Sequence, residues 1–240
     1  MSDSSVEFPL PKIETKIDLI SLTAPFIAAL ESTRLNMSTL GESVRTHAAF
    51  DTFKSNPTLL GGLLAEIHVE DVINRTAMES GWMSLSVRDL LLPTGSIART
   101  SISPMGAIEG FLNRDLISGR RAEVDCGFIL TPETSRDGDR PQIPLAIEVK
   151  ISQNEETVKS AMTDRKMRAT LEPLRRLIKQ TIFQIPTKDD PGLYMLVVGK
   201  DSLAANHQDV LDFKSRGGIY VVLPTNRQEL TELAEKIPTM

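Results

Sequence analysis

Two short, almost entirely apolar runs near the C-terminus constrain the fold most. The first is "LYMLVVG" at residues 193–199, and the second is "GGIYVVLP" at residues 217–224. Runs of this length and composition are typical of strands that are covered on both faces, in the middle of a sheet. Helical patterns alternate with them. The sequence therefore predicts an α/β domain with a mixed central sheet flanked by helices.

Further strands are expected upstream, clustered before the alternation with helices begins. Residues 122–130 and 145–151 read as two strands separated by the polar stretch "TPETSRDGDRPQ", and residues 82–92 look extended. Helices are expected within 13–56, from about 59 to a stop at Gly81, over 155–183 with a break near Pro173, over 207–214 and over 226–237. We divide the chain into an N-terminal helical elaboration, residues 1–56, and a core, residues 57–240, with an irregular insert at 93–121.

Composition bounds the class of protein. The 240 residues are 40% hydrophobic and 25% charged, and no apolar run approaches the roughly 18 residues that a membrane helix needs. The N-terminus lacks the pattern of a secretory signal, so we expect a cytoplasmic protein with no membrane partner. The single cysteine, Cys126, excludes an intramolecular disulfide and a cysteine-built zinc site. The net charge of −5 argues against indiscriminate polyanion binding but is compatible with a local basic cleft.

Three charged residues stand within the two clustered strands. Asp125 lies in the first strand, and Glu148 and Lys150 lie in the second, in the pattern D-x22-E-x-K. Side chains alternate faces along a strand, so Glu148 and Lys150 point the same way while Val149 points to the opposite face. A neighbouring strand can place Asp125 beside Glu148. The charges are then either the solvated face of an edge hairpin or one constructed site.

Adjacent carboxylates favour a metal. Two carboxylates that repel each other are costly to bury unless a cation lies between them. Such oxygen ligands suit magnesium, which keeps several waters and takes phosphate oxygens as further ligands. Lys150 can then orient or help to deprotonate a water. A preceding helix carries Glu66 and Glu70 at or beside its apolar side, and either glutamate could complete the acidic cluster.

These residues and their context resemble the PD-(D/E)xK nuclease superfamily, whose core is commonly αβββαβ, a restriction-endonuclease-like core. The resemblance covers about 140 residues, from about 59 to 199. It implies that Asp125 and Glu148 bind a divalent metal and that Lys150 assists the attacking water. In several members a glycine ends the helix about three turns after its glutamate, which favours Glu70 over Glu66. The chain has Val124 where the motif name expects proline.

Basic residues gather after the E-x-K strand. Between residues 157 and 188 there are eight basic residues and only two acidic ones. Such side chains either form an ordinary solvated face or contact phosphates, which dominate nucleic-acid affinity. The candidate DNA contacts are Arg120, Arg121, Lys159, Arg165, Lys166 and Arg168.

The resemblance and the charges together predict a magnesium-dependent endodeoxyribonuclease, with manganese as a substitute metal. A stand-alone chain of this size most resembles a type II restriction endonuclease, which would act as a homodimer on a specific site in double-stranded DNA. Two alternatives stay open. One is a repair, recombination or mobile-element nuclease with the same site. The other is a non-catalytic DNA-binding protein with a nuclease-like fold.

Overall fold

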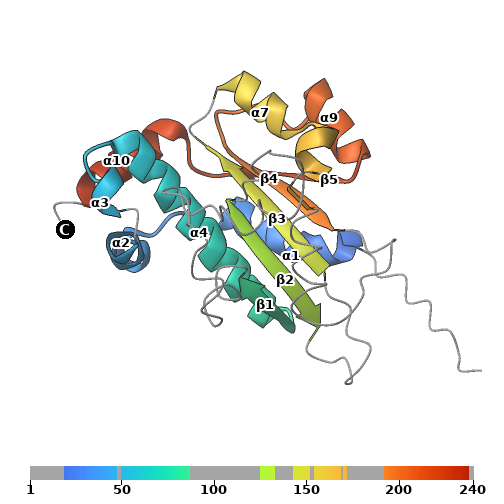
Figure 1. Ribbon diagram of the computed structural model, residues 1–240, viewed down its shortest axis with the longest axis horizontal. Helices are drawn as coiled ribbons and strands as arrows, with labels where there is room; N and C mark the ends of the chain where they lie inside the picture. Colours follow the sequence, from blue (N-terminus) through green and yellow to red (C-terminus); the bar gives the residue numbers. More distant parts are fainter. Residues whose placement is uncertain are drawn as a thin grey trace, which may run out of the picture.

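The computed structural model describes residues 19–47, 50–86, 125–132, 143–151, 154–168, 170–171 and 192–237. These residues form an α/β fold with a five-stranded mixed sheet flanked by helices (Figure 1). In chain order the elements are α1 (Leu19–Ser32), α2 (Met37–Thr46), α3 (Phe50–Phe53), α4 (Pro57–Glu79), β1 (Trp82–Ser86), β2 (Cys126–Pro132), β3 (Ile143–Lys150), α7 (Glu155–Ala161), β4 (Leu193–Gly199), α9 (Gln208–Ser215), β5 (Gly218–Leu223) and α10 (Arg227–Lys236).

The strands lie in the sheet in their sequence order, β1-β2-β3-β4-β5. The first three pair antiparallel, and β3, β4 and β5 pair parallel. The two apolar runs near the C-terminus become β4 and β5, and every residue of β4 is buried. The predicted mixed central sheet is confirmed.

Hydrophobic clusters cover both faces of the sheet. One face packs against α4, α1 and α10 through side chains such as Ile147 and Val197. The other face packs against α7 and α9 through side chains such as Ala146 and Tyr194. Figure 1 shows α4 running across the sheet while α7 and α9 lie together. Alternate residues of one strand therefore serve two different cores, as the period of two requires.

The N-terminal helices share the core of the sheet. Phe26 and Leu30 of α1, Val44 of α2 and Phe53 of α3 are buried in the same cluster as α4 and the strands. Buried side chains of α1, α2 and α3 thus contribute to the cover over the α4 face.

Local sequence signals account for several helix boundaries. The Asn56 side chain accepts a hydrogen bond from the Leu59 amide, and Pro57 fills the first helical position of α4. Gly81, with a φ of 71°, takes the left-handed conformation just beyond the end of α4, as expected of this glycine. Asn226 and Glu229 form a reciprocal capping box at the start of α10.

Several predicted features lie outside the described residues. They are the insert at 93–121, most of the polar stretch between β2 and β3, and the helical segment that follows Pro173. In the part of the chain that is described, no helix has the length and apolar character needed to cross a membrane.

Candidate active site

The register of β2 and β3 brings the two predicted strand carboxylates together. Cys126 is the partner of Ile147, so continuing this antiparallel register by one residue places Asp125 opposite Glu148. Ile147 and Val149 pack toward the α4 face. Glu148 and Lys150 therefore project from the opposite face, as the alternation along the strand predicted.

Lys150 joins the two carboxylates. Its Nζ lies 2.8 Å from Asp125 Oδ2 and 2.9 Å from Glu148 Oε2. Asp125 Oδ2 also accepts a hydrogen bond from the Val149 amide, at 2.8 Å. The exposed fractions of the Glu148 and Asp125 side chains are only 1% and 8%, against 19% for Lys150. The cluster is therefore buried and opens to solvent mainly at the lysine.

A second lysine reaches the same glutamate from the helical side. Lys166 Nζ lies 2.8 Å from Glu148 Oε1, and its side chain is one-third exposed. Lys166 follows α7, which begins soon after β3 with Asn154 as its N-cap. Each oxygen of Glu148 thus faces one ammonium group, while the lysines themselves remain accessible from outside.

The burial of these charges perturbs their protonation. Burial raises the pKa of Glu148, the nearby Asp125 charge raises it further, and Lys150 and Lys166 oppose both effects. For Lys150, burial alone would lower the pKa, but the Asp125 and Glu148 carboxylates more than offset it and the net shift is upward. Lys150 is therefore a firmly protonated cation in this arrangement.

The helix glutamates do not join this pair. Among the described residues, no three histidine, cysteine, aspartate or glutamate side chains group closely enough to hold a metal ion. Glu66 is buried, with 2% of its surface exposed, and its carbonyl accepts a hydrogen bond from Cys126 Sγ, at 3.7 Å. Glu70 lies one turn further along α4 and is half-buried. Thus Glu66, rather than Glu70, has its backbone beside the start of β2, next to Asp125.

Of the predicted DNA contacts in the described ranges, only Lys166 forms an ion pair with the cluster. Lys159 on α7 is engaged with Glu155, at 2.6 Å, and with Asp209, at 3.1 Å. Arg165 and Arg168 are exposed. The two arginines before β2, Arg120 and Arg121, lie outside the described residues.

Tyr194 is a neighbour of the cluster that sequence reasoning missed. Its hydroxyl donates a hydrogen bond to the Ala161 carbonyl, at 3.0 Å, and burial, with the Glu148 and Asp125 charges, raises its pKa. The available signal was its position in a fully buried strand, where a phenol needs a polar partner. The direct contact of Lys166 with Glu148 was also not predicted, because local sequence patterns do not determine how the segment after α7 packs against β3.

We compared the chain with protein-family models, curated proteins and solved structures, and none of the three comparisons finds a match.

Proposed function

We propose that the chain is a metal-dependent endonuclease of the PD-(D/E)xK type that hydrolyses phosphodiester bonds in double-stranded DNA. One observation carries the proposal: the buried Asp125 and Glu148 carboxylates share the Lys150 ammonium group, with separations of 2.8 and 2.9 Å. Glu148 and Lys150 lie at the end of β3, and Asp125 immediately precedes β2, the neighbouring strand, rather than lying within it as the sequence predicted. The order α4, β1, β2, β3, α7, β4 also supports a restriction-endonuclease-like αβββαβ core.

The residues present fit a divalent cation. Magnesium is commonly held by one or two carboxylates and completes its shell with waters and substrate phosphate oxygens. Asp125 and Glu148 supply such a pair, and manganese accepts the same hard oxygen ligands. The raised pKa of Glu148 reflects burial beside a like charge, and a cation between the carboxylates would relieve it. When bound, the metal would stabilise charge developing on the scissile phosphate.

Lys150 is the residue that can position or deprotonate a water. Its raised pKa depends on the two carboxylate charges, because burial by itself works in the opposite direction. Once those charges are balanced by another cation, burial remains and lowers the pKa of Lys150. The same ammonium group that neutralises the free site would then become able to exchange a proton with a water.

The basic side chains support a nucleic-acid substrate. Lys166 is one-third exposed at the edge of the cluster, and Arg165 and Arg168 are exposed nearby in sequence. A partly exposed cation beside a buried acidic site, such as Lys166, suits a phosphate that flanks a scissile bond. Within this class we favour a type II restriction endonuclease, in which a homodimer cuts both strands of a two-fold symmetric site.

Plasmid cleavage tests the proposal. The wild-type protein should convert supercoiled plasmid to discrete fragments with magnesium or manganese and should be inactive with EDTA. Lys150→Met and Asp125→Asn should abolish cleavage, whereas Lys159→Met, which removes an exposed lysine engaged elsewhere, should not. Cleavage confined to branched or damaged DNA would favour a repair or recombination nuclease. Retained DNA binding with no cleavage under either metal would contradict the catalytic proposal.

A further inference from the structure

The carboxylate of Glu148 has one oxygen that the cluster leaves without a hydrogen bond. Oε2 lies 2.9 Å from Lys150 Nζ, and the side chain as a whole is only 1% exposed. Oε1 is fully buried and accepts no hydrogen bond from any residue in the described ranges. Lys166 Nζ lies 2.8 Å from Oε1, close enough for an ion pair, but its direction of approach is not that of a hydrogen bond. A buried carboxylate oxygen in this state favours a further ligand, and hard cations are ligands that such oxygens bind.

Of the two lysines in the cluster, Lys166 is the one that can leave it. Lys150 is 19% exposed, forms ion pairs with both carboxylates and donates a hydrogen bond to Asp125 at 2.8 Å. Lys166 is 33% exposed, and among the described residues it forms an ion pair with Glu148 only. Because a lysine side chain is long and flexible, Lys166 can turn its ammonium group outward without moving its backbone.

The backbone just ahead of Lys166 is fixed to the rest of the fold at two carbonyl groups. The Tyr194 hydroxyl of β4 donates to the Ala161 carbonyl at 3.0 Å, and the Arg216 guanidinium donates to the Met162 carbonyl at 2.9 Å. These bonds hold the segment after α7 against the sheet. Release of the Lys166 side chain would therefore leave its ammonium group beside the site.

The charges of the cluster balance only while no metal is bound. Asp125 and Glu148 supply two negative charges, and Lys150 and Lys166 supply two positive charges within ion-pair distance of them. A divalent cation bound by both carboxylates would add two positive charges to a neutral site. Like charges so close together repel strongly in a buried site, so the more exposed ammonium group would be displaced. An anion at the mouth of the site would then restore the balance.

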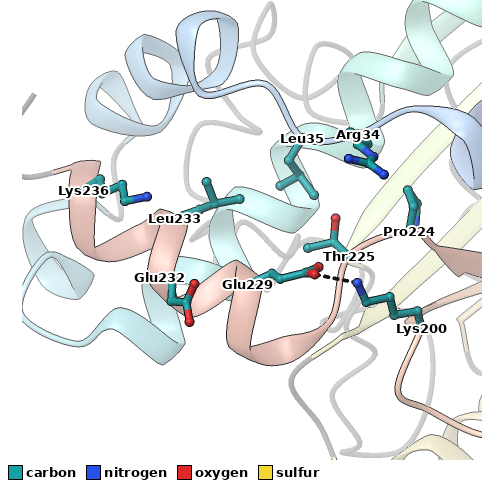
Figure 2. A pocket seen from close by; sticks show the side chains of 9 residues that line it. All are labelled: Arg34, Leu35, Lys200, Pro224, Thr225, Glu229, Glu232, Leu233 and Lys236. Carbon is teal, nitrogen blue, oxygen red and sulfur yellow. Dashed lines mark hydrogen bonds and ion pairs between the residues drawn. The ribbon is translucent and has the colours of Figure 1, made fainter.

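A pocket at the carboxyl ends of β4 and β5 has cations of a different kind (Figure 2). Arg34, Lys200 and Thr225 line it, together with residues of α10. Lys200 pairs with Glu229, and both side chains are nearly half exposed, so water already solvates this pair. The helices and the connection that line the pocket pack on the α4 face, opposite the cluster. The exchangeable cation beside the buried carboxylates is therefore Lys166.

We propose that a divalent metal displaces the Lys166 ammonium group from Glu148, and that the displaced group then binds a backbone phosphate of the DNA in the site. Lys166 thus closes the metal-free site and becomes a phosphate ligand once the metal is bound. Metal and duplex then strengthen each other's binding, because both stabilise the same outward position of the Lys166 side chain. The choice of DNA as the source of the phosphate rests on the proposed function.

Duplex binding measured with and without metal tests the exchange. Fluorescence anisotropy of a labelled duplex, in EDTA and at saturating calcium, compares wild type with Lys166→Met and with Lys159→Met, which loses the same charge on the neighbouring α7. Calcium takes carboxylate and other oxygen ligands, and a denaturing gel confirms that the duplex stays intact. With calcium, Lys166→Met should bind about tenfold more weakly than Lys159→Met, and its slope of log K against log salt should be shallower by roughly 0.9. In EDTA the two variants should bind within about twofold of each other, because Glu148 then holds Lys166.

A variant that releases Lys166 without any metal should gain affinity, which a misfolded protein cannot imitate. In Glu148→Gln the amide keeps the shape of the side chain but no longer attracts the ammonium group. In EDTA this variant should bind duplex about tenfold more tightly than wild type, and combining it with Lys166→Met should remove the gain. Asp212→Asn loses the same charge at an exposed position of α9 and should change the affinity by less than about twofold.

Three results would overturn the exchange. They are an equal loss for Lys166→Met with calcium and in EDTA, a gain in Glu148→Gln that survives the removal of Lys166, and a wild-type duplex affinity that calcium does not change. Plasmid cleavage by wild type is scored separately. A protein that never cleaves but shows the metal-dependent loss refutes the nuclease and keeps this inference. A protein that cleaves while Lys166→Met binds duplex like Lys159→Met in both conditions keeps the nuclease and overturns the exchange.

Discussion

Removing the Lys150 charge should lower the free energy of unfolding, because this side chain forms ion pairs with two buried carboxylates. In Lys150→Met the stem keeps its approximate length, but Asp125 and Glu148 lose a shared cation that lies within 3 Å of both. Breaking a buried ion pair on one side costs about 3–5 kcal/mol. The Val149 amide still donates to Asp125, and Lys166 still faces Glu148. We therefore expect the lower end of the range, about 3 kcal/mol.

The loss should depend on pH in a defined direction. Burial and Asp125 already raise the pKa of Glu148, and loss of Lys150 removes an opposing influence. In the variant the folded state then holds the Glu148 proton to higher pH than the unfolded state does. Its stability relative to wild type should fall as pH rises above the ordinary glutamate value of 4.5. The deficit should be smallest at acid pH, where Glu148 is protonated in both states.

Urea unfolding followed by circular dichroism in EDTA measures the difference, and a thermal melt should show a midpoint roughly 6–12 °C lower for a chain of this size. Lys159→Met is the control, because it removes a lysine whose two ion pairs are exposed. Saturating magnesium should recover part of the loss in Lys150→Met, since a ligand of the folded state alone stabilises it. If Lys150→Met unfolds at the same urea concentration as Lys159→Met, the three charges are not coupled and the reasoning is wrong.

Three further predictions concern single residues of α4 and of the segment after α7. Glu66→Gln should lower the cleavage rate more than Glu70→Gln, because Glu66 is the buried glutamate beside the start of β2; a larger loss in Glu70→Gln would reverse the assignment. Lys166→Met should lower by about tenfold the manganese concentration that gives half of the maximal rise in melting temperature, because the metal no longer competes with an ammonium group for Glu148. Lys159→Met should leave this concentration unchanged. His68, whose pKa is lowered mainly by burial, resists protonation in the folded state, so wild type should lose stability relative to His68→Gln as pH falls below about 6.5; parallel urea curves at pH 7.5 and 5.5 with no relative change would contradict this.

Local patterns predicted the parts of the candidate site that depend on one strand and its neighbour. Alternation alone put Glu148 and Lys150 on one face, and the structure places them there. The polar stretch between two apolar runs made antiparallel pairing of β2 and β3 the simple solution, which brings Asp125 opposite Glu148. The helix glutamate was harder, because spacing to Gly81 favoured Glu70 whereas the described structure buries Glu66. Helix periodicity identifies a few residues that could face the sheet. The angle at which the helix packs on the sheet decides which of them is buried.

The sequence by itself determined the class of fold, since the apolar runs of β4 and β5 need a helix layer on each face of the sheet. The alternation of side chains along a strand also determined that Glu148 and Lys150 point to the same face. Only the tertiary structure decided which distant groups meet. Lys166 reaches Glu148 because the segment after α7 packs back over the sheet, and Arg34 and Thr225 line the same pocket because the α1–α2 connection lies near the end of β5. Such contacts join residues far apart in the chain, and no periodicity within either segment records them.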